Sequence, residues 1–193
     1  MIQLRSPFNQ AEILESWTVG GTAVHDFFAA IETGTFFAAP PGIWSPAENL
    51  VHLIKSCSPV IMALNVPKTV LRIRFGWAKD ESRTLVQVRH TYVNDALANG
   101  GRAGGSFVPE VRDDFSAAHQ ARILAKWQEK GDALAAALQK WSDKDLDKYL
   151  LPHPLLGKMT VREILFFTLY HNMHHVNDVQ RLLGQSEAEW FGA

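Results

Sequence analysis

The sequence predicts an all-α protein, an antiparallel four-helix bundle with an inserted segment. Apolar residues recur every three or four positions over most of the chain, which is the spacing of one face of a helix. Two segments also open with a capping box, a Ser or Thr followed three residues later by Glu. The 193 residues suit a single domain, residues 1–193, because they contain no repeat and no linker.

The first half of the chain is expected to hold two of the bundle helices. The first covers Thr22–Glu32 and is followed by a loop rich in proline and glycine, Thr33–Ile43. A capping box at Ser45–Glu48 then starts a helix over Pro46–Leu64, whose apolar residues form one stripe. Pro59 should kink or interrupt its last turns, because proline has no amide hydrogen to donate.

The middle of the chain contains the inserted segment and a further bundle helix. Val70–Phe75 alternates enough to favour a short strand or an extended connection, and Glu81–Ala98 is expected to be helical. The glycine-rich stretch Asn99–Ser106 predicts a mobile loop, a candidate lid, and it matches no phosphate-binding pattern. Asp113–Trp141 is rich in Ala, Leu, Lys and Gln, which predicts a long amphipathic helix.

The last helix has the clearest limits. Thr160 can cap its start and Glu163 can complete the capping box. Gly184 suits the left-handed position that follows a helix ending at about Leu183. Amphipathic helices of this kind bury their apolar faces together, and four-helix bundles build metal sites from side chains on facing helices.

Histidines are numerous for a chain of this length, and three lie close together in the last helix. His171 and His175 are four residues apart, so their side chains differ by about 40° around the helix axis and can share one metal ion. His174 diverges from His175 and is expected at the rim of such a site or behind its ligands. The spacing also occurs by chance on helices, so the pair alone does not establish a metal site.

A third ligand would have to come from another part of the chain, and helix periodicity does not select it. His52 lies about 170° from the centre of the apolar stripe of its helix, so its face is either exposed or the polar wall of a wet pocket. His153 lies between two prolines and is expected to be a structural turn residue. The upstream candidates are His25, His52, His90, His119 and His153.

Two passages carry a more specific signal: WSPAENLVHL at residues 44–53, and HPLLGKMTVRE at residues 153–163, which leads into YHNMHH at residues 170–175. Both resemble the DinB superfamily, in particular its branch of YfiT-like metal-dependent hydrolases. That family has a helix that begins with Trp and reaches a ligand His eight residues later, and a His-x-x-x-His pair in its last helix. The resemblance covers most of the chain as a single DinB-like domain, although the segment from about Lys68 to Val108 matches nothing in the family pattern.

The resemblance implies that His52, His171 and His175 bind a divalent transition metal such as zinc, nickel or iron. Three protein ligands leave coordination positions open, which is the arrangement of reactive sites. Asp178, where the family often has Gln, and Glu48 each lie about one turn from a ligand and are candidate catalytic residues that could orient an imidazole or act as a general base. The capping box also explains Glu48 in purely structural terms.

The family includes transferases and isomerases that act with low-molecular-weight thiols. The resemblance therefore implies a metal-dependent hydrolase or a thiol S-transferase that acts on a small-molecule substrate. An alternative is a non-catalytic metal-binding or stress-associated interaction protein, because the sequence contains no unmistakable nucleophile or base. A bundle whose histidines bind nothing is a third interpretation.

Composition limits the partners that we expect. The 19 Lys and Arg residues against 20 Asp and Glu leave a formal charge of -1, which argues against a nucleic-acid partner. No apolar stretch is long enough to span a membrane and Met1–Gln10 lacks the apolar core of a signal peptide, so we expect a cytoplasmic protein. Cys57, at an apolar helix position, is expected to be a buried thiol. The resemblance further implies a homodimer.

Overall fold

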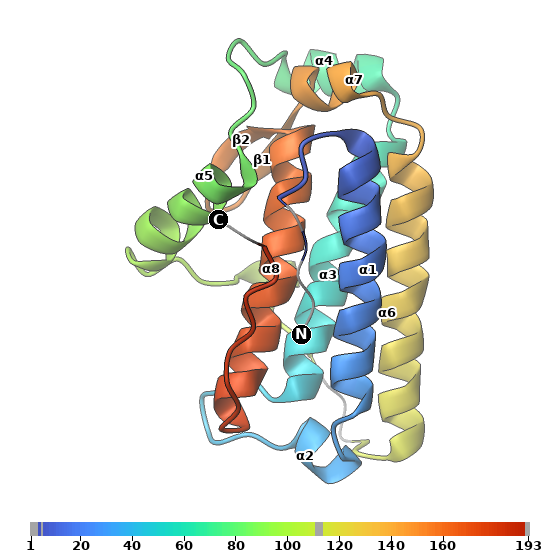
Figure 1. The fold of residues 1–193 in the computed structure, drawn as a ribbon, viewed down its shortest axis with the longest axis vertical. Helices are drawn as coiled ribbons and strands as arrows, with labels where there is room; N and C mark the ends of the chain where they lie inside the picture. Colours follow the sequence, from blue (N-terminus) through green and yellow to red (C-terminus); the bar gives the residue numbers. More distant parts are fainter. Residues whose placement is uncertain (1–3, 5, 111–113, 192–193) are drawn as a thin grey trace.

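Four long helices form the bundle that the sequence predicts (Figure 1). Each of them packs against two others, in the cyclic order α1, α6, α3, α8. The computed structural model describes residues 4, 6–110 and 114–191. The bundle helices are α1 (Gln10–Ala29), α3 (Pro46–Asn65), α6 (Ala117–Leu138) and α8 (Val161–Leu182).

Two of these helices run in each direction, so neighbours are antiparallel in some pairs and parallel in others (Figure 1). α1 and α6 are antiparallel: the Trp17 indole donates to the carbonyl of Gly131 at 3.0 Å, and the Trp127 indole donates to the carbonyl of Gly21 at 2.9 Å. α3 and α8 are antiparallel as well. α3 and α6 run in the same direction, because the inserted segment returns the chain from the end of α3 to the end of the bundle where α3 begins.

Two helix starts follow the capping boxes of the sequence. The amide of Ser45 donates to Glu48 Oε2 at 2.7 Å, and the amide of Glu48 donates to Ser45 Oγ at 3.2 Å. Thr160 and Glu163 exchange the same pair of bonds at the start of α8, both at 3.2 Å. Gly184 follows α8 with a φ of 67°, the left-handed conformation expected at that position.

Two other helices differ in extent from the prediction. α1 includes most of Thr22–Glu32 but begins well before it, because Asn9 and Glu12 form a third capping box. The helix expected over Asp113–Trp141 is α6, which ends at Leu138. The first residue of that expected range lies outside the described residues.

The inserted segment begins with a helix where an extended segment was expected. α3 continues through Pro59, and α4 (Lys68–Phe75) follows it, so the extended prediction for Val70–Phe75 was wrong. Leu71 and Phe75 are four residues apart and Leu71 is buried, so this apolar pair lies on one face of a helix. Helical spacing therefore describes this segment better than alternation does.

The rest of the inserted segment lies beside α8 and then passes over the bundle. α5 (Leu85–His90) packs on α8 and continues as a π-helical stretch, Thr91–Leu97, which confirms most of the helix expected over Glu81–Ala98. The glycine-rich loop that follows ends in a 3-10 turn at Gly105–Phe107, which contacts α3.

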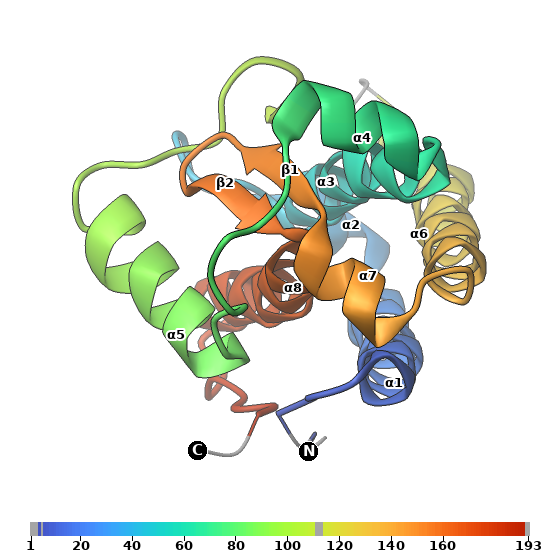
Figure 2. The same ribbon diagram turned by 90° about the horizontal axis from the view of Figure 1, so that it is seen from above.

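A short hairpin precedes the last helix. The strands β1 (Leu150–His153) and β2 (Gly157–Thr160) are antiparallel, with Leu151 opposite Met159, and Figure 2 shows them over the end of the bundle where α8 begins. The remaining elements are the short helices α2 (Thr33–Phe37), between α1 and α3, and α7 (Asp143–Lys148), before β1.

Within the described part of the chain, no single helix is long and apolar enough to cross a membrane. α3 and α4 reach the required length and composition together, but the chain bends by 107° between them. The bundle interior is apolar and includes Cys57, whose thiol is buried as expected. Three of the buried polar residues are histidines, and these define the candidate site.

Candidate metal site

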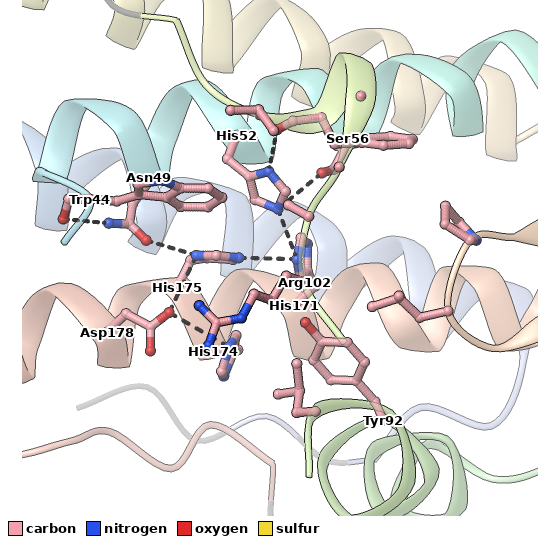
Figure 3. Close-up of a pocket in the computed structure, with 18 of the residues that line it drawn as sticks. Trp44, Asn49, His52, Ser56, Tyr92, Arg102, His171, His174, His175 and Asp178 are labelled. Atoms are coloured by element: carbon pink, nitrogen blue, oxygen red, sulfur yellow. Dashed lines mark hydrogen bonds and ion pairs between the residues drawn. The ribbon is translucent and has the colours of Figure 1, made fainter. Parts of the chain in front are cut away.

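Three imidazoles meet between α3 and α8 (Figure 3). His52 lies on α3, His171 and His175 lie one turn apart on α8, and each side chain is almost fully buried. Nε2 of His171 is 3.2 Å from Nε2 of His52 and 3.1 Å from Nε2 of His175. The structure therefore brings together the three residues that the family resemblance implied as ligands.

Helix periodicity did not decide whether the His52 face of α3 is exposed or forms the wall of a pocket, and the structure answers this question. This face of α3 does not join the apolar core, but neither is it exposed, because His52 is only 4% accessible. The glycine-rich loop lies against this face and the space between them is a cavity lined by Asn49, His52 and Ser56. The face is thus the polar wall of a pocket, the second of the two alternatives.

Hydrogen bonds donated by Nδ1 fix the tautomers of two rings. His52 Nδ1 donates to the carbonyl of Phe107 at 2.7 Å, and His175 Nδ1 donates to Asn49 Oδ1 at 2.7 Å. The Asn49 amide nitrogen donates to the carbonyls of Trp44 and Ser45, so its oxygen must face His175. With the proton on Nδ1, both rings present the Nε2 lone pair to the centre of the cluster.

These nitrogens fit a tetrahedral metal ion. Zinc lies about 2.0–2.1 Å from imidazole nitrogens, so two ligand nitrogens at a tetrahedral ion are about 3.3 Å apart. The observed separations from His171 are 3.2 and 3.1 Å. Because Nε2 of His171 can donate one proton at most, at least one of these two close Nε2 pairs would lack a hydrogen bond if no cation lay between them.

Protonation does not readily supply that positive charge. Burial, and then repulsion from neighbouring imidazoles, lowers the pKa of His171 and His175 well below the usual value. Burial also lowers the pKa of His52. The three rings are therefore neutral near pH 7, the state in which imidazole binds metals.

Aromatic side chains hold the rings in place. Trp44 stacks on His175, with ring centroids 6.0 Å apart and 19° between the planes, and it also contacts His52. Phe167, one turn before His171, stacks on that ring at 4.9 Å. These apolar faces restrict rotation of the imidazoles and exclude water from behind the cluster.

Asp178 lines the cavity beside the cluster but does not orient His175 as directly as expected. Its Oδ2 lies 3.5 Å from His175 Nδ1 and 3.6 Å from His174 Nε2, whereas the Asn49 oxygen is much closer to His175. The Asp178 carboxylate instead accepts a hydrogen bond from Arg181. Asn49 is thus the orienting residue that the sequence interpretation missed, although it shares the polar face of its helix with His52.

His174 lies at the rim, as expected, with 22% of its side chain exposed. His174, His175 and Asp178 form a second group close enough to share an ion. That group would use Nδ1 of His175, which already donates to Asn49. The first group leaves this hydrogen bond intact and is therefore the better metal site.

Glu48 lies outside the cavity that contains the histidine cluster. Its carboxylate accepts hydrogen bonds from the amide and the hydroxyl of Ser45, and Glu48 is not among the residues that line the cavity. The capping box accounts for its position completely. The suggestion of a catalytic role for Glu48 has no support in this geometry.

His153 lines the cavity, whereas the sequence predicted only a structural role for it in a turn. It does serve the turn, because its Nδ1 accepts from the amides of Leu155 and Leu156 at 3.2 and 3.1 Å. Its ring also packs on Phe167 at 4.3 Å, and burial lowers its pKa to about 4. With Nδ1 accepting, the proton of this neutral ring lies on Nε2.

The cavity has a volume of about 1140 Å³, enough for a small organic molecule. The glycine-rich loop forms one wall, and the carbonyl of Phe107, directly after this loop, accepts a hydrogen bond from His52. The expected lid is therefore linked directly to a candidate ligand. Further lining residues are Ile43, Trp44, Tyr92, Leu97, Arg102, Leu155, Phe167, Arg181 and Leu182.

Comparison with known proteins gives two matches. A family model of the DinB superfamily matches residues 17–179. Among solved structures, the chain is similar to YfiT from Bacillus subtilis, described as a probable metal-dependent hydrolase with an unusual four-helix bundle topology, with a TM-score of 0.61 and 15% identity over 94% of this chain and 93% of that chain. At this identity the similarity shows the fold. No curated protein matches significantly.

Proposed function

The chain belongs to the DinB superfamily, and on this premise we propose that it is a metal-dependent enzyme whose divalent transition metal is held by His52, His171 and His175. The observation that supports this most directly is the convergence of three Nε2 atoms whose rings are held in the metal-binding tautomer or at metal-binding distance. The description of YfiT as a metal-dependent hydrolase agrees with this proposal.

The proposed reaction is hydrolysis of a small molecule or transfer of a low-molecular-weight thiol to a small electrophile. A divalent ion at this position would supply Lewis-acid chemistry, which lowers the pKa of a bound water or thiol and polarises a carbonyl. Asp178 lines the same cavity and is the candidate to accept the proton that the nucleophile releases. His153 presents a neutral ring that can donate from Nε2 to an oxygen of the substrate.

The cavity favours an enzyme over a non-catalytic metal-binding protein. A protein that only binds an ion needs no space beside it, whereas this cluster lies in the wall of a cavity of about 1140 Å³. The wall combines aromatic and aliphatic side chains with a few polar groups, as binding sites for small molecules commonly do.

Metal binding is tested by elemental analysis of untagged protein and by titration of the metal-free protein with zinc, nickel and iron(II). We expect one ion per chain for the wild type and none at the same metal concentration for His171→Ala or His52→Ala. His25→Ala is the matched control, because His25 lies on α1 and outside the cavity. Equal binding by His171→Ala and wild type would refute the proposed site.

Activity is tested separately, with the loaded protein and a panel of esters, amides and electrophiles, each with and without glutathione or bacillithiol. We expect turnover that is lost with the metal and restored when it is added back. Asp178→Asn should reduce kcat while metal content stays near one per chain. A loaded protein that turns over none of a broad panel would favour the non-catalytic alternative.

A further inference from the structure

The charges in the cavity are unequal. Its described lining residues include two guanidinium groups, on Arg102 and Arg181, and one carboxylate, on Asp178. Arg181 pairs with Asp178 and also lies 2.8 Å from Glu187, so its charge is shared by two carboxylates. Arg102 makes no ion pair with any carboxylate in the described part of the chain. Its charge is available to a molecule that enters the cavity.

The loop presents Arg102 in a defined position. The amides of Gly100 and Gly101 donate to the carbonyls of Leu97 and Ala96, both at 2.9 Å. A Cβ at Gly101 would lie 2.6 Å from the Ala96 carbonyl oxygen, so this close approach requires glycine. Figure 3 shows the Arg102 side chain reaching from the loop into the cavity, on the side where the histidines of α8 lie.

The far end of the loop is tied to α3. The carbonyl of Phe107 accepts from His52, and the carbonyl of Val108 accepts from Lys55 at 2.7 Å. Hydrogen bonds therefore hold the chain both before and after Arg102. A ligand that binds Arg102 would lie between this loop and the candidate metal site.

We propose that Arg102 binds a carboxylate of a small reactant, so that the enzyme acts on carboxylic acids with a largely apolar carbon skeleton. A guanidinium binds a carboxylate through two parallel hydrogen bonds, and the rest of the wall offers apolar surface from Ile43, Leu97 and Leu155. Phosphate fits less well, because the second guanidinium is already engaged and the loop lacks a phosphate-binding pattern. The inference rests on the proposed function for the reacting group beside the acid, but binding to Arg102 does not need the metal.

The test compares 3-phenylpropanoate with 3-phenylpropanamide, which has the same shape and no charge, by calorimetric or NMR titration of the metal-free protein. We expect the wild type to bind the acid at least about tenfold more tightly than the amide. Arg102→Ala should remove this preference and leave amide binding unchanged, and Arg102→Lys should keep part of it. Arg122→Ala is the matched control, because Arg122 is an exposed α6 residue that pairs with Asp114.

A second pair of probes, N-acetylcysteine and its amide, identifies the source of the carboxylate. An Arg102-dependent preference for either acid supports the proposal, and it shows whether the acid belongs to the electrophile or to a thiol. If neither acid is preferred, or if the preference survives in Arg102→Ala, the proposal is overturned. Zinc binding measured on the same samples keeps the two proposals apart, since a protein that prefers the acid but binds no zinc would refute only the metal site.

Discussion

Two of the candidate ligands are oriented by oxygen atoms that would not touch the metal. His175 donates to Asn49 and His52 donates to the carbonyl of Phe107, and in each case the Nδ1 proton turns Nε2 toward the cluster. Residues that orient metal-bound histidines in this way commonly contribute a factor of about 10–100 to metal affinity. The Phe107 contact comes from the backbone, so only the Asn49 contact can be tested by a simple substitution.

Asn49→Ala should weaken zinc binding by about 10–100-fold, because the His175 ring loses the acceptor that holds it. Asn49→Asp should keep most of the affinity, since a carboxylate oxygen can still accept from Nδ1. Competition with a zinc-binding dye measures both values. Asn65→Ala, near the end of the same helix and outside the cavity, is the control. Equal affinities for Asn49→Ala and wild type would show that Asn49 only stabilises the start of α3.

His153 should make stability depend on pH. Burial lowers its pKa to about 4, so in the folded protein it stays neutral at pH values where the unfolded chain, with a pKa near 6.5, takes up a proton. Acid therefore favours unfolding between these two values. His153→Asn, whose amide oxygen can still accept from the turn, should reduce the pH slope of the unfolding free energy by at most about 1.4 kcal/mol per pH unit. Urea unfolding of the metal-free proteins at pH 7 and pH 5 measures this, and identical slopes would contradict it.

The residues of the site differ in how far they could be predicted. His171 and His175 could be paired from spacing, because both lie on one helix. His52 could not, because its distance from the pair depends on how α3 and α8 pack, and only the family resemblance selected it. Asn49 carried a weak signal, as a polar residue on the face of His52. Phe107 carried none, because it acts through its carbonyl group.

At the scale of elements, a buried carboxylate joins the inserted segment to the helix that carries two candidate ligands. Glu163 is 5% exposed, and it accepts from the backbone amide, Nε and Nη2 of Arg83 at 2.8, 3.1 and 3.1 Å. It also completes the capping box of α8 with Thr160. One side chain thus stabilises the start of α8 and binds Arg83, two residues before α5 begins.

Glu163→Gln should lower the free energy of unfolding by about 1–3 kcal/mol, because a buried group loses charge-assisted hydrogen bonds to Arg83. Urea unfolding of the metal-free protein measures the change. Glu129→Gln is the matched control: Glu129 pairs with Lys126 on the surface of α6 and should change stability by less than about 0.5 kcal/mol. Similar losses for both variants would mean that the Arg83 contact adds nothing beyond an exposed pair.

Helix starts could be predicted at Ser45 and Thr160, where a Ser or Thr is followed three residues later by Glu and an apolar stripe begins. The start of α1 differs from the predicted start at Thr22, because the helix is capped by Asn9 and not by a Ser or Thr. The pattern within α4 predicts an extended segment because apolar and polar residues alternate over Val70–Phe75. Over eight residues alternation and helical spacing overlap, and burial of Leu71 against the rest of the fold decides between them.

At the scale of the whole molecule, the bundle could be predicted but its helix directions could not. An amphipathic stripe shows which face of a helix is buried, and it does not show which way a neighbour runs. The parallel packing of α3 and α6 follows from the inserted segment, whose path the local patterns do not determine. This arrangement also places α3 antiparallel to α8, which lets residues 49 and 52 on one helix meet residues 175 and 171 on the other in reverse order.

Because His52 and His171 are 119 residues apart in the chain, only the folded protein brings the three candidate ligands together. An ion that binds the folded state alone stabilises it by about 4 kcal/mol when its free concentration is 1,000 times the Kd. For a chain of this size each kcal/mol raises Tm by about 2–4 °C. We therefore expect zinc at that concentration to raise Tm by about 8–16 °C, as measured by differential scanning calorimetry. His171→Ala should lose this increase and His25→Ala should keep it. An equal increase in His171→Ala would mean that zinc stabilises the fold from some other site, and the link between α3 and α8 through a shared ion would be refuted.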